Sequence, residues 1–259
     1  TPTRRGWPVL LTVAVLADHG EGLAYGGEHL GLAVREPSEI VRASIEPLRL
    51  AAQDYRTDVA RALDLSQGDY YSRYLGFDDR DCLAAVFAAA AAPCPPERLA
   101  RLIARKAAYY REEIRRHGYP VFAGAAELVH EAAAAGLTLA VVSGALREEV
   151  VGGLEQAGIL GLFKQLVTAD DVQRGKPDPE GYALALAGLN AEPPLPARLI
   201  HPHECVAIED SPAGLAAAAA CGLRTLGVAQ TYAASELAAA DAVIEKLDGF
   251  RLRDLEVSL

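Results

Sequence analysis

Cysteine is scarce in this sequence, and the spacing of the cysteines excludes two common uses. Cys82, Cys94, Cys205 and Cys221 form no CxxC pair, which is the spacing typical of zinc sites and thioredoxin-like redox motifs. Four cysteines dispersed over 259 residues do not indicate a disulfide framework either. We therefore expect reduced thiols and a cytoplasmic protein.

Net positive charge and long apolar stretches are also missing. The formal net charge is -10, which argues against a nucleic-acid backbone as the main partner because like charges repel. No apolar run reaches the roughly 18 residues that a membrane-spanning helix needs. We expect no nucleic-acid partner and no membrane span. A small anionic ligand is still compatible with this charge, because a bound metal ion can invert the local field.

The two common glycine-rich phosphate loops, GxGxxG and GxxxxGK[ST], do not occur, which disfavours dinucleotide-binding and P-loop proteins. The sequence does have a large apolar fraction, 51%. This is enough to bury the core of one large domain or of two smaller ones.

The C-terminal half alternates strand-like and helix-like segments. Each apolar run is followed by a helical pattern that ends near glycine; the strand-like runs are 137–144, 163–171, 205–210 and 224–229. This rhythm predicts βαβ units, and hence an α/β fold with a Rossmann-like parallel sheet and helices on both faces. Ligands of such sheets bind at the carboxyl ends of the strands.

The segment from about 45 to 117 differs from the rest, because its patterns are helical and no clear strand occurs in it. It is interpreted as a helical module inserted before the βαβ series. Further on, a proline-broken loop at 191–204 contains His201 and His203. Without cysteine partners nearby, this pair is interpreted as structural rather than as a metal site.

Polar side chains follow the ends of three predicted strands or lie in the loops after them. Ser143 and Gly144 offer a hydroxyl and backbone N–H groups to a phosphate at a helix N-terminus. Lys176 supplies a point charge suited to phosphate. Glu209 and Asp210 are hard oxygen ligands of the kind that Mg²⁺ prefers. Together they predict a metal-assisted phosphoryl-transfer site.

Each of these residues also has an ordinary interpretation when it is taken alone. Ser143 is compatible with a turn serine and Lys176 with a solvated lysine. Asp210 or Ser211 is compatible with an N-cap of the helix that begins near Pro212. Their combination, in this order and at these strand ends, is what favours the functional interpretation.

Three stretches carry a resemblance to a known family. VVSGALREEV (141–150), RGKPDPEGYALAL (174–186) and VAIEDSPAGLAAAAACGL (206–223) resemble the second, third and fourth motifs of the haloacid dehalogenase (HAD) superfamily. The resemblance is closest to β-phosphoglucomutase-like phosphatases with a helical cap, and it covers roughly residues 45 to 245.

The resemblance implies a HAD-like core with an inserted α-helical cap that selects the substrate. It implies that Ser143, Gly144 and Lys176 bind the transferring phosphate and that Glu209 and Asp210 hold Mg²⁺. The expected activity is that of a Mg²⁺-dependent phosphatase or phosphomutase-like enzyme acting on a small phosphorylated metabolite such as a sugar phosphate. The expected assembly is a monomer or homodimer.

The family's first motif, DxDG(T/V) after the first strand, is not recognisable. Its first aspartate attacks phosphorus and its second acts as general acid and base. Matching VLAD at 15–18 to the end of the motif puts Leu11 and Val13 at the two aspartate positions. Taking Asp18 as the nucleophile instead leaves Gly20 where the acid belongs.

A third placement matches residues 30–48 to the first strand and its exit, with Glu36 and Ser38 at the two aspartate positions. It gives the usual spacing to the cap and to Ser143, and is therefore preferred. The corresponding domains are an N-terminal extension of unknown role, a core in two pieces and a cap: 1–30, 31–49 with 118–259, and 50–117.

The missing motif leaves two functions to be distinguished. The first is an active phosphatase with an irregular first motif. The second is a catalytically impaired HAD-fold protein that binds phosphate or metal in a regulatory or binding role, because removal of a nucleophile typically costs many orders of magnitude in rate.

Overall fold

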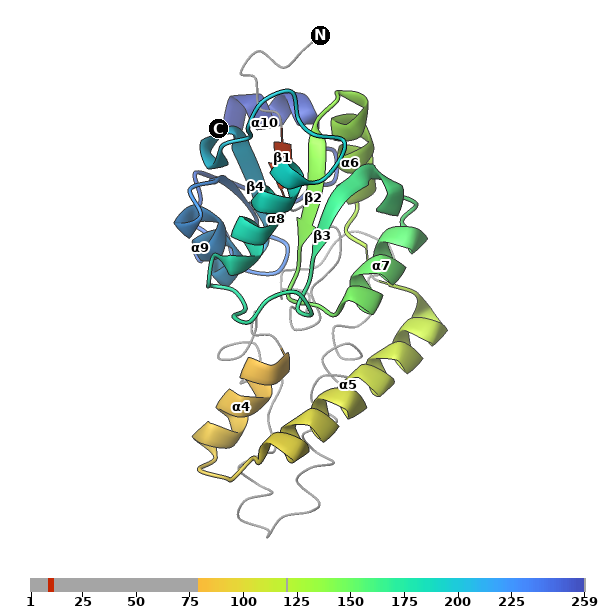
Figure 1. Cartoon of the computed structure of the whole chain (residues 1–259), viewed down its shortest axis with the longest axis vertical. Helices are drawn as coiled ribbons and strands as arrows, with labels where there is room; N and C mark the ends of the chain where they lie inside the picture. Colours follow the sequence, from red (N-terminus) through yellow and green to blue (C-terminus); the bar gives the residue numbers. More distant parts are fainter. Residues whose placement is uncertain (1–8, 12–78, 120, 259) are drawn as a thin grey trace. The chain divides into compact units, whose positions relative to one another are not determined.

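The computed structural model describes residues 9–11, 79–119 and 121–258. These residues fall into two compact units (Figure 1). An α/β unit holds Val9–Leu11 and the chain from Tyr119 onward, and a helical unit holds the described residues up to Gly118.

The α/β unit is built on one sheet of six parallel strands in the order β3-β2-β1-β4-β5-β6. The strands are β1 (Val9–Leu11), β2 (Thr138–Val142), β3 (Phe163–Val167), β4 (Cys205–Glu209), β5 (Arg224–Val228) and β6 (Ala242–Ile244). The chain order reverses at β1, which has β2 on one side and β4 on the other. Reversals of this kind create the crevice where parallel α/β sheets bind ligands. The predicted α/β parallel fold is confirmed.

Helices pack on the sheet because successive residues of each strand point to opposite faces. α8 (Glu180–Ala191) packs on β2 and β3, and α9 (Pro212–Ala220) packs on β4 and β5, with α8 and α9 in contact (Figure 1). The core between these helices and the sheet contains Ala140, Val142, Val167, Tyr182, Ala185, Leu189, Ile200, Cys205, Ala207, Ala217, Ala218 and Leu223. The other α-helices in the described part of this unit are α6 (Ala125–Ala134), which packs on β2, α7 (Arg147–Gln156), and α10 (Leu252–Ser258), which contacts α6.

The structure corrects the placement of the first strand that the sequence favours. Val9–Leu11 pairs in parallel with both β2 and β4, with Leu11 opposite Ala140 and Ala207. This central position therefore belongs to residues that the sequence assigns to an extension at 1–30. The sequence places the first strand within residues 30–48 because of its distance from the helical module and from Ser143. That distance is a poor guide here because the motif that would mark the end of the strand is missing. A short apolar run is what a strand covered on both faces requires.

The described part of the helical unit consists of α4 (Asp79–Ala89) and α5 (Pro96–His117), which pack against each other. Pro96 occupies the first turn of α5, where its missing N–H has no cost, and Gly118 ends the helix with φ 74°. The proposed start of the cap at residue 50 lies outside the described residues. Within the described ranges, no helix combines the length and apolar character needed to cross a membrane.

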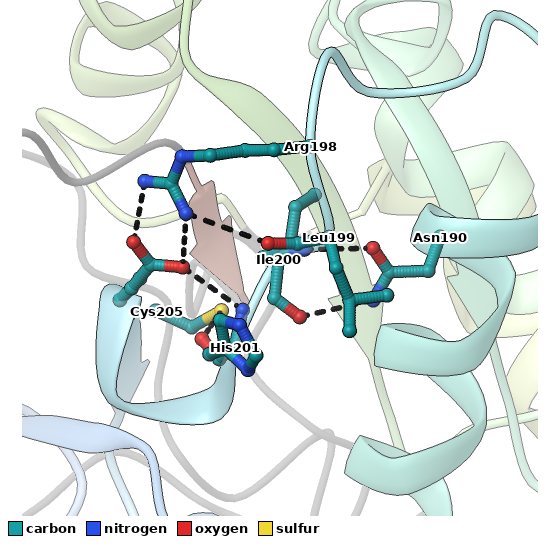
Figure 2. A network of polar contacts seen from close by, with 7 residues as sticks. Asn190, Arg198, Leu199, Ile200, His201 and Cys205 are labelled. Carbon is teal, nitrogen blue, oxygen red and sulfur yellow. Dashed lines mark hydrogen bonds and ion pairs between the residues drawn. The ribbon is translucent and has the colours of Figure 1, made fainter.

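The proline-broken loop between α8 and β4 is held by a polar network (Figure 2). The Asn190 side chain accepts a hydrogen bond from Ile200 N (2.8 Å) and donates to Ile200 O (3.0 Å), so one amide satisfies both backbone groups. Arg198 pairs with Glu204, whose carboxylate also accepts from His201 N at 3.0 Å in the short 3₁₀ turn η2 (Pro202–Glu204). The rings of His201 and His203 stack, with centroids 5.7 Å apart.

Asn190→Ala is expected to lower the free energy of unfolding by about 1–3 kcal/mol, because partly buried backbone groups of Ile200 lose their partners. Urea unfolding monitored by circular dichroism measures the change. Glu192→Ala, an exposed change two residues away, is the control and should stay within about 0.5 kcal/mol of the unaltered protein. Equal stability of both variants would contradict an anchoring role for Asn190.

Candidate active site

A buried ion pair lies at the carboxyl end of β4. Lys176, in the loop between β3 and α8, places its Nζ 2.7 Å from Oε1 of Glu209, the last residue of β4. The Lys176 side chain is 14% exposed and that of Glu209 is 2% exposed. The Tyr182 hydroxyl donates a hydrogen bond to the same carboxylate oxygen. Thirty-three residues separate the two members of the ion pair, so the fold brings them together.

The carboxylate of Glu209 is enclosed on its other side by α9. A Cβ built on Gly214 would lie 2.1 Å from Glu209 Oε2, so only glycine leaves room for the carboxylate at this position. Burial raises the pKa of the Glu209 carboxyl, and the charge of Lys176 opposes that shift. The arrangement fixes the carboxylate, and with it the position of the lysine.

Asp210 points elsewhere, because consecutive residues at a strand end alternate between the two faces of the sheet. Its Oδ2 accepts a hydrogen bond of 2.6 Å from the hydroxyl of Thr231, in the loop after β5, and both residues are buried. Ser211, not Asp210, caps α9, since its Oγ accepts from Gly214 N at 3.0 Å. The side chain of Asp210 is thus held by a neighbouring loop rather than used as a helix cap.

Ser143 begins the turn after β2. Its backbone N–H donates to Val167 O at 2.9 Å, and its Oγ accepts from Ala145 N at 3.1 Å. The hydroxyl hydrogen can still donate to a ligand, so this turn geometry is compatible with phosphate binding. Gly144 follows it in a partly exposed turn.

Arg147 ties this turn to the loop that leads to Lys176. Its guanidinium contacts Asp171 Oδ2 at 2.7 Å and Leu166 O at 3.1 Å, and its backbone N–H donates to Asp170 Oδ2 at 2.7 Å. Thr168 donates to Asp171 Oδ2 through both its N–H and its hydroxyl, each at 2.8 Å. The loops after β2 and β3 are therefore joined.

The sheet order relates these groups to one another. Ser143 follows β2 and Glu209 ends β4, and these two strands flank β1. Neighbouring strands are about 4.8 Å apart, so the carboxyl ends of β2 and β4 are separated by about 10 Å. Ser143 and the Lys176–Glu209 ion pair therefore belong to the two strand ends on either side of β1.

The donor set is compatible with Mg²⁺ but does not enclose it. Mg²⁺ in proteins commonly takes one or two carboxylates together with substrate phosphate and water. Asp210 is a buried carboxylate of the right kind, whereas Oε1 of Glu209 is engaged by Lys176 and Tyr182. In the ranges that the structure describes, no three His, Cys, Asp or Glu residues are grouped to hold a metal ion.

The proposed nucleophile positions lie outside the described residues. This holds for Glu36 and Ser38, and for Asp18. With β1 ending at Leu11, the placement with Leu11 and Val13 at the aspartate positions is the one that puts the motif at the end of this strand. After β1, the sequence reaches its first carboxylate at Asp18.

Sequence reasoning assigns no role to four of the side chains in this arrangement, which are Tyr182, Thr231, Arg147 and Asp171. Tyr182 lies within a helical pattern, where an aromatic residue normally indicates core packing. Thr231 comes from a loop with no motif, and the pairing of Arg147 with Asp171 needs the two loops to be adjacent. Two signals could have drawn attention to Tyr182: its place within the stretch RGKPDPEGYALAL and its hydroxyl at a core position.

Comparison with known proteins gives consistent matches. The family model for haloacid dehalogenase-like hydrolases matches residues 13–222. Validoxylamine A 7'-phosphate phosphatase of Streptomyces hygroscopicus subsp. limoneus is 39% identical over 128 residues, 49% of this chain and 56% of that protein. Pyrophosphatase PpaX of Bacillus pumilus is 35% identical over 101 residues, 39% of this chain and 43% of that protein. The chain thus spans about half the length of these curated relatives.

Solved structures show the same fold. β-Phosphoglucomutase from Clostridium difficile superposes with a TM-score of 0.67 at 16% identity, covering 96% of this chain and 95% of that one. CbbY from Rhodobacter sphaeroides, solved with phosphate, gives a TM-score of 0.65 at 23% identity and covers 82% and 89% of the two chains. The family model covers most of the sequence, and the fold and the second to fourth motifs agree with it. The chain therefore belongs to the haloacid dehalogenase-like hydrolase family.

Proposed function

We propose that this protein is a Mg²⁺-dependent phosphatase or phosphomutase-like enzyme that acts on a small phosphorylated metabolite. The observation that carries the proposal is Lys176, anchored on the buried carboxylate of Glu209 next to the central strand β1. A cation held in this way presents a fixed positive charge to a phosphoryl group without reorganisation during the reaction. The phosphatases among its relatives support the same class of substrate.

Each of the candidate site residues has a role in the proposed reaction. Ser143 and Gly144 bind the phosphate oxygens through the hydroxyl and the turn, and Lys176 neutralises the charge that develops on the phosphoryl group. Asp210, oriented by Thr231, contributes a carboxylate to Mg²⁺. The metal would supply further charge neutralisation on the phosphoryl oxygens. The helical unit is proposed to select the substrate.

The proposed reaction needs a carboxylate nucleophile near the end of β1. Asp18 is the first carboxylate after β1 in the sequence and is our first candidate for the nucleophile. The preference for Glu36 and Ser38 assumes that the first strand lies within residues 30–48, but β1 is Val9–Leu11. Phosphate release from a panel of sugar phosphates, phosphoglycolate and a chromogenic phosphate ester, with and without Mg²⁺, tests the activity. Comparing Asp18→Asn with Glu36→Gln in the same assay identifies the carboxylate on which turnover depends.

The second candidate function, a catalytically impaired protein that binds phosphate or metal, is favoured by one specific observation. Leu11 is the last residue of β1 and stands at the first aspartate position in the motif placement that fits this strand, and a leucine side chain cannot attack phosphorus. Phosphate binding measured by calorimetry, without turnover on any substrate of the panel, would establish this second function. If the unaltered protein neither binds phosphate nor turns over any substrate of the panel, both candidate functions are refuted.

Asp210→Asn is expected to weaken Mg²⁺ binding by about tenfold or more, because a carboxylate ligand is replaced by a neutral amide. Isothermal titration calorimetry with MgCl₂ measures the affinity. Asp241→Asn is a matched control, because Asp241 Oδ2 accepts a hydrogen bond of 3.1 Å from the hydroxyl of Thr225 in a similar Thr–Asp pair at another place. Equal Mg²⁺ affinity in the Asp210 variant and the control would remove Asp210 from the metal site.

A further inference from the structure

We propose that Tyr182 is a positioning residue that sets how tightly Glu209 holds Lys176, and thereby how readily Lys176 binds a phosphoryl group. This rests on the proposed function of Lys176. Tyr182 lies in the first turns of α8 and its side chain is fully buried, with 0% exposure. The hydroxyl of a core tyrosine needs a buried partner, and here it donates to a carboxylate of the candidate site.

Two donors share one oxygen of the Glu209 carboxylate. Oε1 accepts from the Tyr182 hydroxyl and, at 2.7 Å, from the Lys176 ammonium. Oε2 lies against Gly214, where a single added carbon would overlap it. Because Glu209 is buried and its Oε2 lies against α9, the carboxylate has little room to turn, and we expect a change at the tyrosine to reach the lysine.

The ring of Tyr182 also lies near Lys176. The Nζ atom lies 6.0 Å from the centroid of the tyrosine ring, at the outer limit of a cation–π contact. The ring thus limits the position of the ammonium. The hydroxyl donates to the Glu209 carboxylate and so offsets part of the negative charge with which the ammonium is paired. A carboxylate that already accepts a strong hydrogen bond attracts the lysine less, which leaves the lysine more available to an incoming anion.

Removal of the hydroxyl alone distinguishes this role from core packing. Tyr182→Phe keeps the ring and its volume but leaves the whole charge of Glu209 to Lys176. We expect the Kd for inorganic phosphate, measured by isothermal titration calorimetry at fixed Mg²⁺, to rise about tenfold. Tyr119→Phe makes the same chemical change in the α/β unit, outside the Glu209 network, and should bind phosphate as the unaltered protein does.

Unchanged phosphate affinity in Tyr182→Phe would overturn the inference, even if that variant unfolds more easily, because a purely structural tyrosine predicts only that loss. If the unaltered protein binds no phosphate, the proposed function fails instead. In that case a double-mutant cycle in urea with Tyr182→Phe and Lys176→Met decides the inference. If the fold-change of the unfolding constant in the double variant equals the product of the fold-changes in the two single variants, the residues are not coupled and the inference is overturned. A departure from that product would support the inference.

Discussion

Lys176→Met is expected to lower the free energy of unfolding by about 3–5 kcal/mol, because it leaves the buried carboxylate of Glu209 without its cation. The side chains of this pair are only 14% and 2% exposed, so solvent screens the loss weakly. Methionine preserves most of the length and volume of the lysine, which limits the contribution of lost packing. Urea unfolding of the whole chain, followed by fluorescence and circular dichroism, measures the change.

The chain offers a matched control for this substitution. Lys246 pairs with Asp248 at 3.0 Å, but both side chains are exposed, at 57% and 61%. Lys246→Met should therefore cost at most about 1 kcal/mol. A loss of that small size in Lys176→Met as well would show that the Glu209 carboxylate is solvated or neutral rather than dependent on the lysine.

A second substitution separates stability from phosphate binding. Adding Glu209→Gln to Lys176→Met removes the uncompensated charge while keeping an oxygen that can accept from Tyr182. The double variant should recover most of the lost stability, because removal of a whole buried pair is far less costly than removal of one partner. It should still fail to bind phosphate, because no cation is restored. Recovered phosphate binding in the double variant would exclude Lys176 from the anion site.

Gly214→Ala is expected to destabilise the protein by about 1–3 kcal/mol or more, which is the range for overpacking a buried site. Alanine normally stabilises a helix by up to about 1 kcal/mol relative to glycine, so propensity alone predicts the opposite sign. The added methyl would lie 2.1 Å from Glu209 Oε2 and 2.3 Å from the carboxyl carbon. Thermal unfolding monitored by calorimetry measures the result.

Gly161→Ala is the control for this effect, because a Cβ at Gly161 meets nothing within 4 Å. That variant should unfold at nearly the same temperature as the unaltered protein. The Gly214 variant should also bind phosphate less tightly, since a displaced Glu209 no longer holds Lys176 in place. An increase in stability for Gly214→Ala would mean that the Glu209 carboxylate does not occupy the space beside α9.

Much of the fold is predictable from the sequence, because apolar runs and helical patterns alternate with a clear rhythm after residue 137. The first four residues of β4, Cys205 to Ile208, are apolar without alternation, as a strand covered on both faces requires. The first strand is not predictable in the same way. Val9–Leu11 is only three residues long, and its place depends on pairing with β2 and β4, which are more than a hundred residues away.

The candidate site is predictable as a set of residue types but not as a set of contacts. Glu209 and Asp210 are adjacent in the sequence and invite a shared role, yet strand alternation sends one to Lys176 and the other to Thr231. Aspartate and serine are both favoured N-cap residues, so residue type does not decide which of Asp210 and Ser211 caps α9. The backbone geometry at the start of the helix decides it. The partners of Glu209 come from positions far along the chain, so tertiary packing alone selects them.

The hydrogen bonds between the loops after β2 and β3 have a consequence for motion. Ser143 N donates to Val167 O and Ala169 N donates to Ala145 O, while Arg147 bridges to Asp171. Neither loop can open without breaking several of these bonds together, so their amides share a single opening free energy. We therefore expect the width of this edge of the candidate site to vary little, and ligands of different size to be accommodated by other parts of the protein than these two loops.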